Sequence, residues 1–352
     1  MSSHHRTNWH RKRGSTVTTD STDTRAQRRK SPKKPENALV SADRAGAGLD
    51  RGFAGLAKAA GIFILIILAF VAIFLSWNSV GALYQEEEGL IIGRFLSYAW
   101  PFALGTVVVA ILALIMGAPI AIAVALYISH YAPPKASKTI GYIIDLLAAI
   151  PSVVYGAWGM FVLAPAMVPL YHWLSQWLYT WPEENLGWGI PFFAGSPGLG
   201  QNIFTASVVL AVMILPIISS VCREIFIQTP KLHEEAALAL GATRWEMIKM
   251  AVFPFARPGI ISGVMLGLGR ALGETMAVVM VVSGLGFQLS IISPGNSTIP
   301  REIALNFGET GHGTERWHQL VALGLVLFVI TLAVNMVARW IVSRHKEFSG
   351  AN

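Results

Sequence analysis

Two oppositely charged residues stand four positions apart inside an otherwise apolar part of the chain, in Gly269-Arg270-Ala-Leu-Gly273-Glu274-Thr275. Arg270 follows Pro258 by 12 residues, about 18 Å along a helix that rises 1.5 Å per residue, which places it near the middle of a bilayer. A charged side chain at that depth is costly and usually faces a water-filled path or a partner. A guanidinium presents a planar fork of donors that suits the oxygens of a phosphate or a similar oxyanion. Arg270 and Glu274 therefore predict an anion site within the membrane.

The same spacing also fits a purely structural role. Residues i and i+4 lie on one face of a helix, so Arg270 and Glu274 could pair and fix the packing of that helix. The two roles are compatible, because Glu274 could hold Arg270 in place and moderate its affinity so that an anion is released. Both interpretations stay open from the residues alone.

A second charged stretch lies between two long apolar segments and is too polar to span a bilayer. Thr229 is a candidate N-cap, Pro230 suits the first helical position, and Gly241 is a plausible helix stop. Thr243-Arg-Trp-Glu246 has the spacing of a capping box and should start a second short helix that ends near Pro254. These signals predict a compact helix–turn–helix on the membrane surface, and an ordinary amphipathic interfacial helix pair is the alternative.

No enzyme motif is found in the chain. A nucleotide-binding P-loop ends in Gly-Lys followed by Ser or Thr, and no lysine here follows a glycine. His233-Glu-Glu-Ala-Ala237 begins like a zinc-protease helix but has an alanine where the second histidine belongs. The single cysteine, Cys222, excludes an intrachain disulfide and a multi-cysteine metal site. We therefore expect no catalysis, no metal site and no cofactor bound by this chain.

The elements that must position these residues are membrane-spanning helices. Apolar residues make up 53% of the 352 residues and charged residues only 13%, whereas soluble domains carry about twice that share of charge. We expect an all-α integral membrane protein with spans near the roughly 20 residues that a bilayer requires. Pro119, Pro151 and Pro216 fall inside spans, so kinked helices are expected. The six expected spans are residues 61–80, 101–128, 143–163, 203–221, 259–283 and 318–342.

The positive charges predict the orientation. With the N-terminus inside, 23 of the 27 Lys and Arg residues fall on the inner side, against Arg94, Arg301 and Arg316 on the outer side. This asymmetry follows the positive-inside rule, so both termini and the charged helix–turn–helix should be cytoplasmic. The expected organisation is a disordered basic tail (1–58), a six-helix membrane domain (59–345) with a cytoplasmic loop (222–258), and a short C-terminal tail (346–352).

The N-terminal tail carries two basic clusters, Arg11-Lys-Arg13 and Arg28-Arg-Lys30. Such clusters can bind nucleic acid, but here they adjoin a membrane segment. Attraction to anionic lipid is the simpler account, and we expect no nucleic-acid partner. The apolar run that follows is longer than the core of a signal peptide, so a retained anchor is expected.

Three segments carry a resemblance to a known family. They are Leu146–Pro165, Gly263–Ala277, and the charged stretch in which Glu235-Ala236-Ala237 is followed by Gly241 and then Pro254. The charged stretch resembles the EAA loop of ABC-importer permeases. Together the three segments resemble the permease subunits of phosphate-specific ABC importers, the PstC family, over residues 60–345.

The resemblance implies a type I importer permease fold, also called MetI-like, in a bacterial inner membrane. It also implies a heterodimer with a PstA-like second permease, a PstB-like ATPase dimer that holds ATP and Mg²⁺, and an external PstS-like phosphate-binding protein. In the family the EAA loop couples to the ATPase, and a charged pair in the next span takes part in phosphate translocation. The matching coupling residues are Glu235, Ala236, Ala237, Gly241 and Pro254, and the matching translocation residues are Arg270 and Glu274.

Three alternatives to a phosphate importer can be weighed from these features. Another oxyanion, sulfate or molybdate, carried by an ABC importer is the nearest. A secondary transporter would need no ATPase, so a coupling loop argues against it. A structural membrane scaffold would not explain an arginine in the middle of the membrane.

Overall fold

The computed structural model describes residues 36–85, 89–90, 92–286 and 288–345, and the chain divides into two compact units, 1–65 and 66–352. The described part of the first unit belongs to helix α1 (Glu36–Leu83), which continues into the second unit. We expected 1–58 to be disordered, but residues 36–58 are helical, because this alanine-rich run continues without a break into the apolar span. Both basic clusters of the tail, and residues 346–352, lie outside the described residues.

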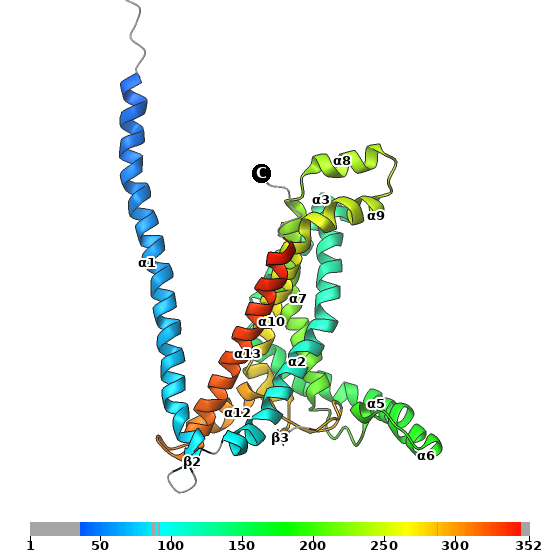
Figure 1. Cartoon of the computed structure of the whole chain (residues 1–352). Coiled ribbons are helices and arrows are strands. Elements are labelled where there is room, and N and C mark those ends of the chain that lie inside the picture. The colour runs from blue at the N-terminus through cyan, green and yellow to red at the C-terminus, as the bar shows by residue number, and fades with distance from the viewer. Residues whose placement is uncertain (1–35, 86–88, 91, 287, 346–352) are drawn as a thin grey trace, which may run out of the picture. The chain divides into compact units, whose positions relative to one another are not determined.

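Within the described residues, six helical segments are long and apolar enough to cross a membrane, the number that the sequence predicts. They are Gly52–Ala82, Gly93–Tyr131, Ser152–Leu186, Ile203–Ile227, Arg244–Leu272 and Glu315–Ile341. Four long helices of the second unit are α2 (Ile92–Leu126), α7 (Ile203–Ile227), α10 (Phe253–Leu272) and α13 (Glu315–His345), and the last three frame the site (Figure 1).

The third expected span, residues 143–163, is not one kinked helix. α3 (Pro134–Ala148) ends before Pro151, and α4 (Ser152–Trp158) begins directly after it. Proline lacks an N–H and disfavours a helical conformation of the residue before it, so the helix restarts instead of bending. The apolar segment then runs through the π-helical turn Gly159–Leu163 into α5 (Ala164–Ser175). The segment that follows the expected span, residues 164–186, is therefore helical.

The fifth expected span, residues 259–283, is also interrupted. α10 ends at Leu272, residues 273–275 are not helical, and α11 covers Met276–Val281. At its N-terminal end the span is longer than expected, because α9 (Arg244–Met247), the π-helical turn Ile248–Val252 and α10 are continuous. We predicted that the second short helix would end near Pro254, and this prediction was wrong, because the helix continues through Pro254. The wider π-helical turn directly before this proline provides an irregular backbone that accommodates the ring.

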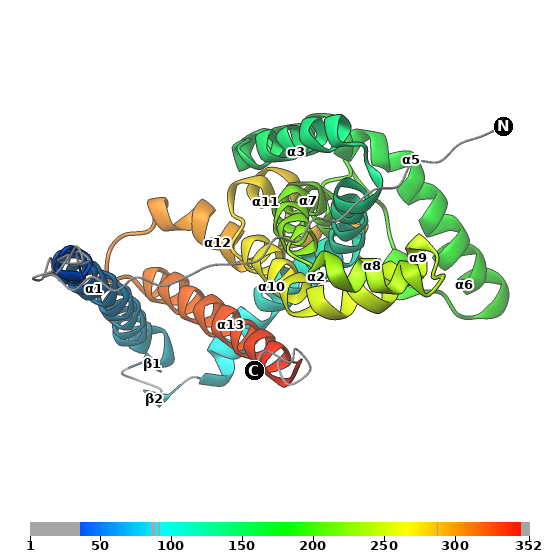
Figure 2. The ribbon, with the colours of Figure 1, turned by 90° about the horizontal axis from the view of Figure 1, so that it is seen from above.

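α7 lies at the centre of the second unit. Figure 2 shows it among α2, α3, α10 and α11, and it packs most extensively against α2 and α10. α10 approaches α7 closely through glycines. A Cβ at Gly259 would lie 2.6 Å from the side chain of Ile225, and a Cβ at Gly267 would lie 2.6 Å from that of Ile218. Small residues at such positions allow helix backbones to approach each other in membranes. Gly269 differs, because a Cβ there would meet open space.

Short elements join the ends of these helices. β1 (Tyr84–Gln85) pairs antiparallel with β2 (Gly89–Leu90), and β3 (Gly284–Gly286) pairs in parallel with β4 (Gly295–Asn296). The helices α6 (Trp181–Leu186) and α12 (Ile299–Asn306) precede α7 and α13, respectively. The turn between β4 and α12 touches α2, where Thr106 Oγ1 accepts a hydrogen bond of 2.9 Å from the Ile299 N–H.

Candidate functional site

Arg270 lies in the last turn of α10, and the polarity of that position suits its charge. The carbonyl end of a helix carries a partial negative charge that favours a cation. Half of the Arg270 side chain is exposed, at 50%, and its Nη2 lies 3.8 Å from Oε2 of Glu274. The pairing that the i, i+4 spacing suggested is therefore present, although Gly273 and its neighbours interrupt the helix between the two residues. Its role in binding an anion stays a prediction.

Glu274 is held by the start of the next helix. Its side chain is only 5% exposed, and its Oε1 accepts a hydrogen bond of 3.2 Å from the Ala277 N–H in the first turn of α11. A carboxylate at a helix N-terminus is stabilised both by the free N–H groups and by the helix dipole. Glu274 is thus fixed between two helices, with one oxygen toward α11 and the other toward Arg270. The sequence alone did not indicate this capping role.

Arg270 opens into a hollow of about 960 Å³ between α7, α10 and α13. Each helix contributes one face at helical spacing. The lining is Ile217 and Val221 of α7, Ser262, Met265, Leu266, Gly269 and Arg270 of α10, and Asn335, Ala338 and Arg339 of α13. None of the described residues that line the hollow is acidic. A mostly apolar wall with two arginines, an amide and a hydroxyl is a setting that can accept a small anion.

Arg339 was counted in the sequence only among the positive charges of the inner end. The structure places it on the wall of the same hollow as Arg270. The signal that could have revealed it is the pair Asn335 and Arg339, which stand four residues apart inside the last apolar run and so share one helical face.

The second charged stretch forms the expected helical hairpin. α8 (Lys231–Ala239) ends in a Schellman motif: Gly241 N–H bonds to Leu238 O at 3.0 Å, and Ala242 N–H bonds to Ala237 O at 3.2 Å. Gly241 has a φ of +85°, in the left-handed region that favours glycine. The helix stop predicted at Gly241 is confirmed.

The start of each hairpin helix was predicted with different success. The capping box at α9 is confirmed, because Thr243 Oγ1 accepts from the Glu246 N–H while the Glu246 carboxylate accepts from the Thr243 N–H. At α8 the prediction was wrong by one residue: Pro230 is the N-cap, and the buried Thr229 hydroxyl has no partner within the described residues. Pro230 has no backbone N–H, so its position as the N-cap leaves no N–H unpaired there.

The outward surface of the hairpin combines charge with exposed apolar side chains. Glu235, Ala236 and Pro254 are exposed, and Ala237 is partly buried against the core. Leu232 and Leu240, also on or beside α8, are 75% and 90% exposed. Exposed apolar side chains on a charged surface helix are typical of a protein docking site.

α8 is tied to the end of the second span by a contact that the sequence did not indicate. His130, in the π-helical turn Tyr127–Tyr131 after α2, places its Nε2 3.5 Å from Oε1 of Glu234. The other ring nitrogen of His130 lies 2.7 Å from the Ser129 hydroxyl. The hairpin is therefore connected to α2 as well as to α7 and α10.

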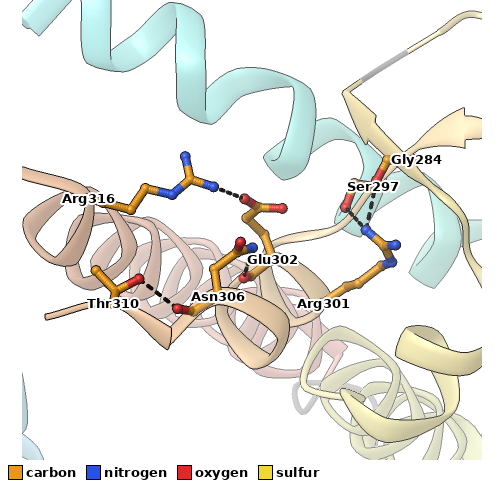
Figure 3. A network of polar contacts seen from close by, with 7 residues as sticks. All are labelled: Gly284, Ser297, Arg301, Glu302, Asn306, Thr310 and Arg316. Carbon is orange, nitrogen blue, oxygen red and sulfur yellow. Dashed lines mark hydrogen bonds and ion pairs between the residues drawn. The ribbon is translucent and has the colours of Figure 1, made fainter. Parts of the chain in front are cut away.

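A second charged cluster surrounds α12 and the N-terminal end of α13 (Figure 3), whereas Arg339 lies near the C-terminal end of α13. Arg316 Nη2 bonds to Oε1 of the buried Glu302 at 2.7 Å. Arg301 donates to the carbonyl oxygens of Val282 and Gly284, at 2.9 and 2.7 Å, and so anchors the segment that follows α11. Burial lowers the pKa of the Arg301 guanidinium. These two arginines, which the sequence showed only as outer charges, organise this end of the structure.

The described residues contain no group of three or more His, Cys, Asp and Glu side chains that could hold a metal ion. Cys222 is a free, buried cysteine.

Comparison with known proteins places this architecture. The family model described as "Binding-protein-dependent transport system inner membrane component" matches residues 117–347. The phosphate transport system permease protein PstC 2 of Mycobacterium tuberculosis is 39% identical over 302 residues, covering 82% of this chain and 90% of the relative. The phosphate transport system permease protein PstC of Xylella fastidiosa strain Temecula1 is 38% identical over 318 residues, covering 86% of this chain and 93% of the relative.

A solved structure supports the fold alone. A bacterial ABC transporter involved in the import of the acidic polysaccharide alginate matches with a TM-score of 0.53 and 20% identity, covering 86% of this chain and 99% of the matched chain. The resemblance predicted from three segments is thus confirmed over most of the chain, together with the all-α permease fold. The chain belongs to the family of binding-protein-dependent transport system inner membrane components, the membrane permeases of ABC transporters, and both relatives compared above are PstC permeases.

Proposed function

We propose that this chain is the transmembrane permease subunit of an ATP-driven importer of inorganic phosphate and forms half of the translocation path. Its similarity to PstC permeases over about nine tenths of their length supports phosphate as the cargo. The observation that carries the site is the half-exposed Arg270, which opens into a hollow between three helices while its carboxylate partner is buried beside it.

The geometry of the charged pair suits transient binding. A hydrogen-bonded pair of guanidinium and carboxylate groups has N···O distances of about 2.7–2.9 Å, so the 3.8 Å between Arg270 and Glu274 marks a looser contact. The guanidinium keeps donors that can turn toward a phosphate oxygen in the hollow. Glu274 cannot follow, because Ala277 and burial hold it. An anion that enters therefore competes with Glu274 for Arg270, which favours release over tight retention.

The α8–α9 hairpin is the proposed coupling element. Both termini and this hairpin lie on the cytoplasmic side, as the distribution of Lys and Arg supports. The motif residues Glu235, Ala236, Ala237, Gly241 and Pro254 present the hairpin to a PstB-like ATPase dimer. ATP and Mg²⁺ are held by that ATPase and no cofactor is held by this chain. The remaining partners are a PstA-like second permease and an external PstS-like phosphate-binding protein.

An importer of sulfate or molybdate remains the alternative cargo class, because a guanidinium also binds those tetrahedral oxyanions. A secondary transporter is disfavoured by the family, whose members work in binding-protein-dependent ABC systems. Competition of sulfate or molybdate with phosphate for uptake distinguishes a phosphate importer from an importer of those anions.

The test is uptake of radiolabelled phosphate by the complete transporter in proteoliposomes loaded with ATP. We expect uptake that unlabelled phosphate suppresses and that excess sulfate or molybdate leaves unchanged. Arg270→Gln should abolish uptake, because the neutral amide cannot replace the charge-assisted bonds of the guanidinium. Glu274→Gln should also impair it.

The matched control is Arg344→Gln, which removes the same charge from α13 instead of α10. Co-purification of the second permease and the ATPase shows whether each variant assembles. Normal phosphate uptake by an assembled Arg270→Gln transporter would sink the anion-site hypothesis.

A further inference from the structure

The hollow contains a second arginine whose role the family motifs do not cover. Arg339 is exposed and lines the wall formed by α13, one turn beyond Asn335. Within the described part of the chain, no carboxylate lies within ion-pair distance of Arg339, in contrast to Arg270 beside Glu274. Arg339 is thus a cation in a largely apolar hollow, without a counter-charge from the described residues.

The directions of the helices set the order of the polar groups along the hollow. α10 and α13 pack against each other and run in opposite directions, as their colours show in Figure 1. Arg270 is eight residues beyond Ser262 on α10, which corresponds to about 12 Å of helix. Because α13 runs the other way, Arg339 is displaced from Asn335 toward the Ser262 end. The hollow therefore has Arg270 at one end and Arg339 toward the hairpin end.

We propose that Arg339 is a second oxyanion-binding residue, which takes the transported anion from Arg270 on its way inward. This inference rests on the proposed function. Neither arginine closes on a tight ion pair within the described residues. Ser262 and Asn335 line the same hollow, and their hydroxyl and amide can donate to the same anion. Two weak sites in series let an anion enter and leave, which a single tight site would prevent.

A phosphate group could also reach Arg339 from a lipid, because basic residues near the inner membrane surface attract anionic headgroups. The proposal commits to the transported anion, since the hollow that Arg339 lines continues to Arg270. The experiment must therefore vary the lipid as well as the residue.

The test uses the complete transporter, with the second permease, the ATPase and the external binding protein, in proteoliposomes. Phosphate uptake and ATP hydrolysis are measured together, in phosphatidylcholine alone and in a mixture with phosphatidylglycerol. For Arg339→Gln we expect about a tenfold fall in phosphate carried per ATP, the size expected from losing a charge-assisted hydrogen bond. The fall should appear in both lipids. Arg339→Lys should restore part of the ratio, because lysine keeps the charge without the planar fork.

Arg344→Gln is the matched control, since it removes the same charge from the same helix. Its ratio should stay at the wild-type value. An equal fall in Arg344→Gln, a fall confined to phosphatidylglycerol, or an unchanged ratio in Arg339→Gln would each overturn the proposal. Should Arg339→Gln fail to assemble, Arg339→Met gives the same test with a side chain that suits the apolar wall.

Failure of the proposed function has a different signature. Wild-type transporter would then carry sulfate or molybdate in place of phosphate, and the Arg339 variants would be compared with that anion. Normal phosphate uptake by the wild type together with an unchanged Arg339→Gln ratio would reject the second site alone.

Discussion

The backbone at Gly241 provides a direct test of the coupling hairpin. Its φ of +85° lies in the left-handed region, and a Cβ built there would meet nothing within 4 Å. A substitution therefore strains the backbone without any steric clash. The left-handed conformation costs an ordinary L-residue about 1–2 kcal/mol, which corresponds to about a 5- to 30-fold loss in the population of the correct hairpin. We expect Gly241→Ala to weaken ATPase association by that factor.

A series at this position separates conformation from charge. Gly241→Asn should cost less than Gly241→Ala, because asparagine enters the left-handed region several-fold more often than most residues. Gly241→Asp adds a negative charge at the C-terminus of α8, where the helix dipole disfavours it by about 0.3–1 kcal/mol. We expect Gly241→Asp to abolish uptake and to weaken ATPase association, and Gly241→Asn to retain both in part.

The assay is co-purification of the ATPase with each variant, followed by ATP-dependent phosphate uptake in proteoliposomes. Gly187→Ala is the matched control, because Gly187 has a φ of +71°, equally open surroundings and a place at the end of α6, away from the hairpin. Gly187→Ala should leave ATPase association unchanged. The reasoning is refuted by a Gly241→Asp permease that still co-purifies with a coupled ATPase and supports uptake.

Three further perturbations test the packing of α10, the cap of α9 and the charged cluster around α12. Gly267→Leu should lower the thermal unfolding midpoint in detergent, because the larger side chain overpacks against Ile218 at a cost of about 1–3 kcal/mol. Gly269→Ala is its control and should leave the midpoint unchanged, since its Cβ meets open space. Thr243→Ala should cost about 1 kcal/mol by removing the N-cap of α9, seen as faster hydrogen exchange of the first α9 amides. Arg316→Gln should destabilise the fold by about 3 kcal/mol, because it leaves the buried Glu302 carboxylate unpaired; an unchanged unfolding midpoint would contradict that.

Local backbone signals were the most predictable part of the chain. The capping box at Thr243 and the helix stop at Gly241 each depend on hydrogen bonds within a few residues, so the sequence contains all the information needed. The six apolar segments could be predicted for a similar reason, since burying a span in lipid depends on its own composition. The pairing of Arg270 with Glu274 also follows from short spacing.

Features set by other helices could not be predicted in this way. Whether Pro151 bends a helix or ends it depends on the packing of α3 and α4, and composition alone favoured a single span. The cap that Glu274 provides for α11 requires the break at Gly273, which no pattern marked. Arg339 looked like any inner positive charge, because only the contact of α13 with α10 brings it to the hollow of Arg270.

The continuity of α9, the π-helical turn and α10 bears directly on how the hairpin could influence a residue in the last turn of α10. Had the chain broken at Pro254, movement of the hairpin would have reached Arg270 only through side-chain packing. Instead, one helical segment runs from Arg244 to Leu272, and the 26 residues from Arg244 to Arg270 correspond to about 39 Å of helix. The glycines that face α7 let this helix lie close to its neighbour, while its opposite end carries the arginine that opens into the hollow. A tilt imposed on the hairpin by a bound ATPase would therefore displace the Arg270 guanidinium relative to Glu274, which α11 holds separately. The loose 3.8 Å contact is the distance that such a tilt would change.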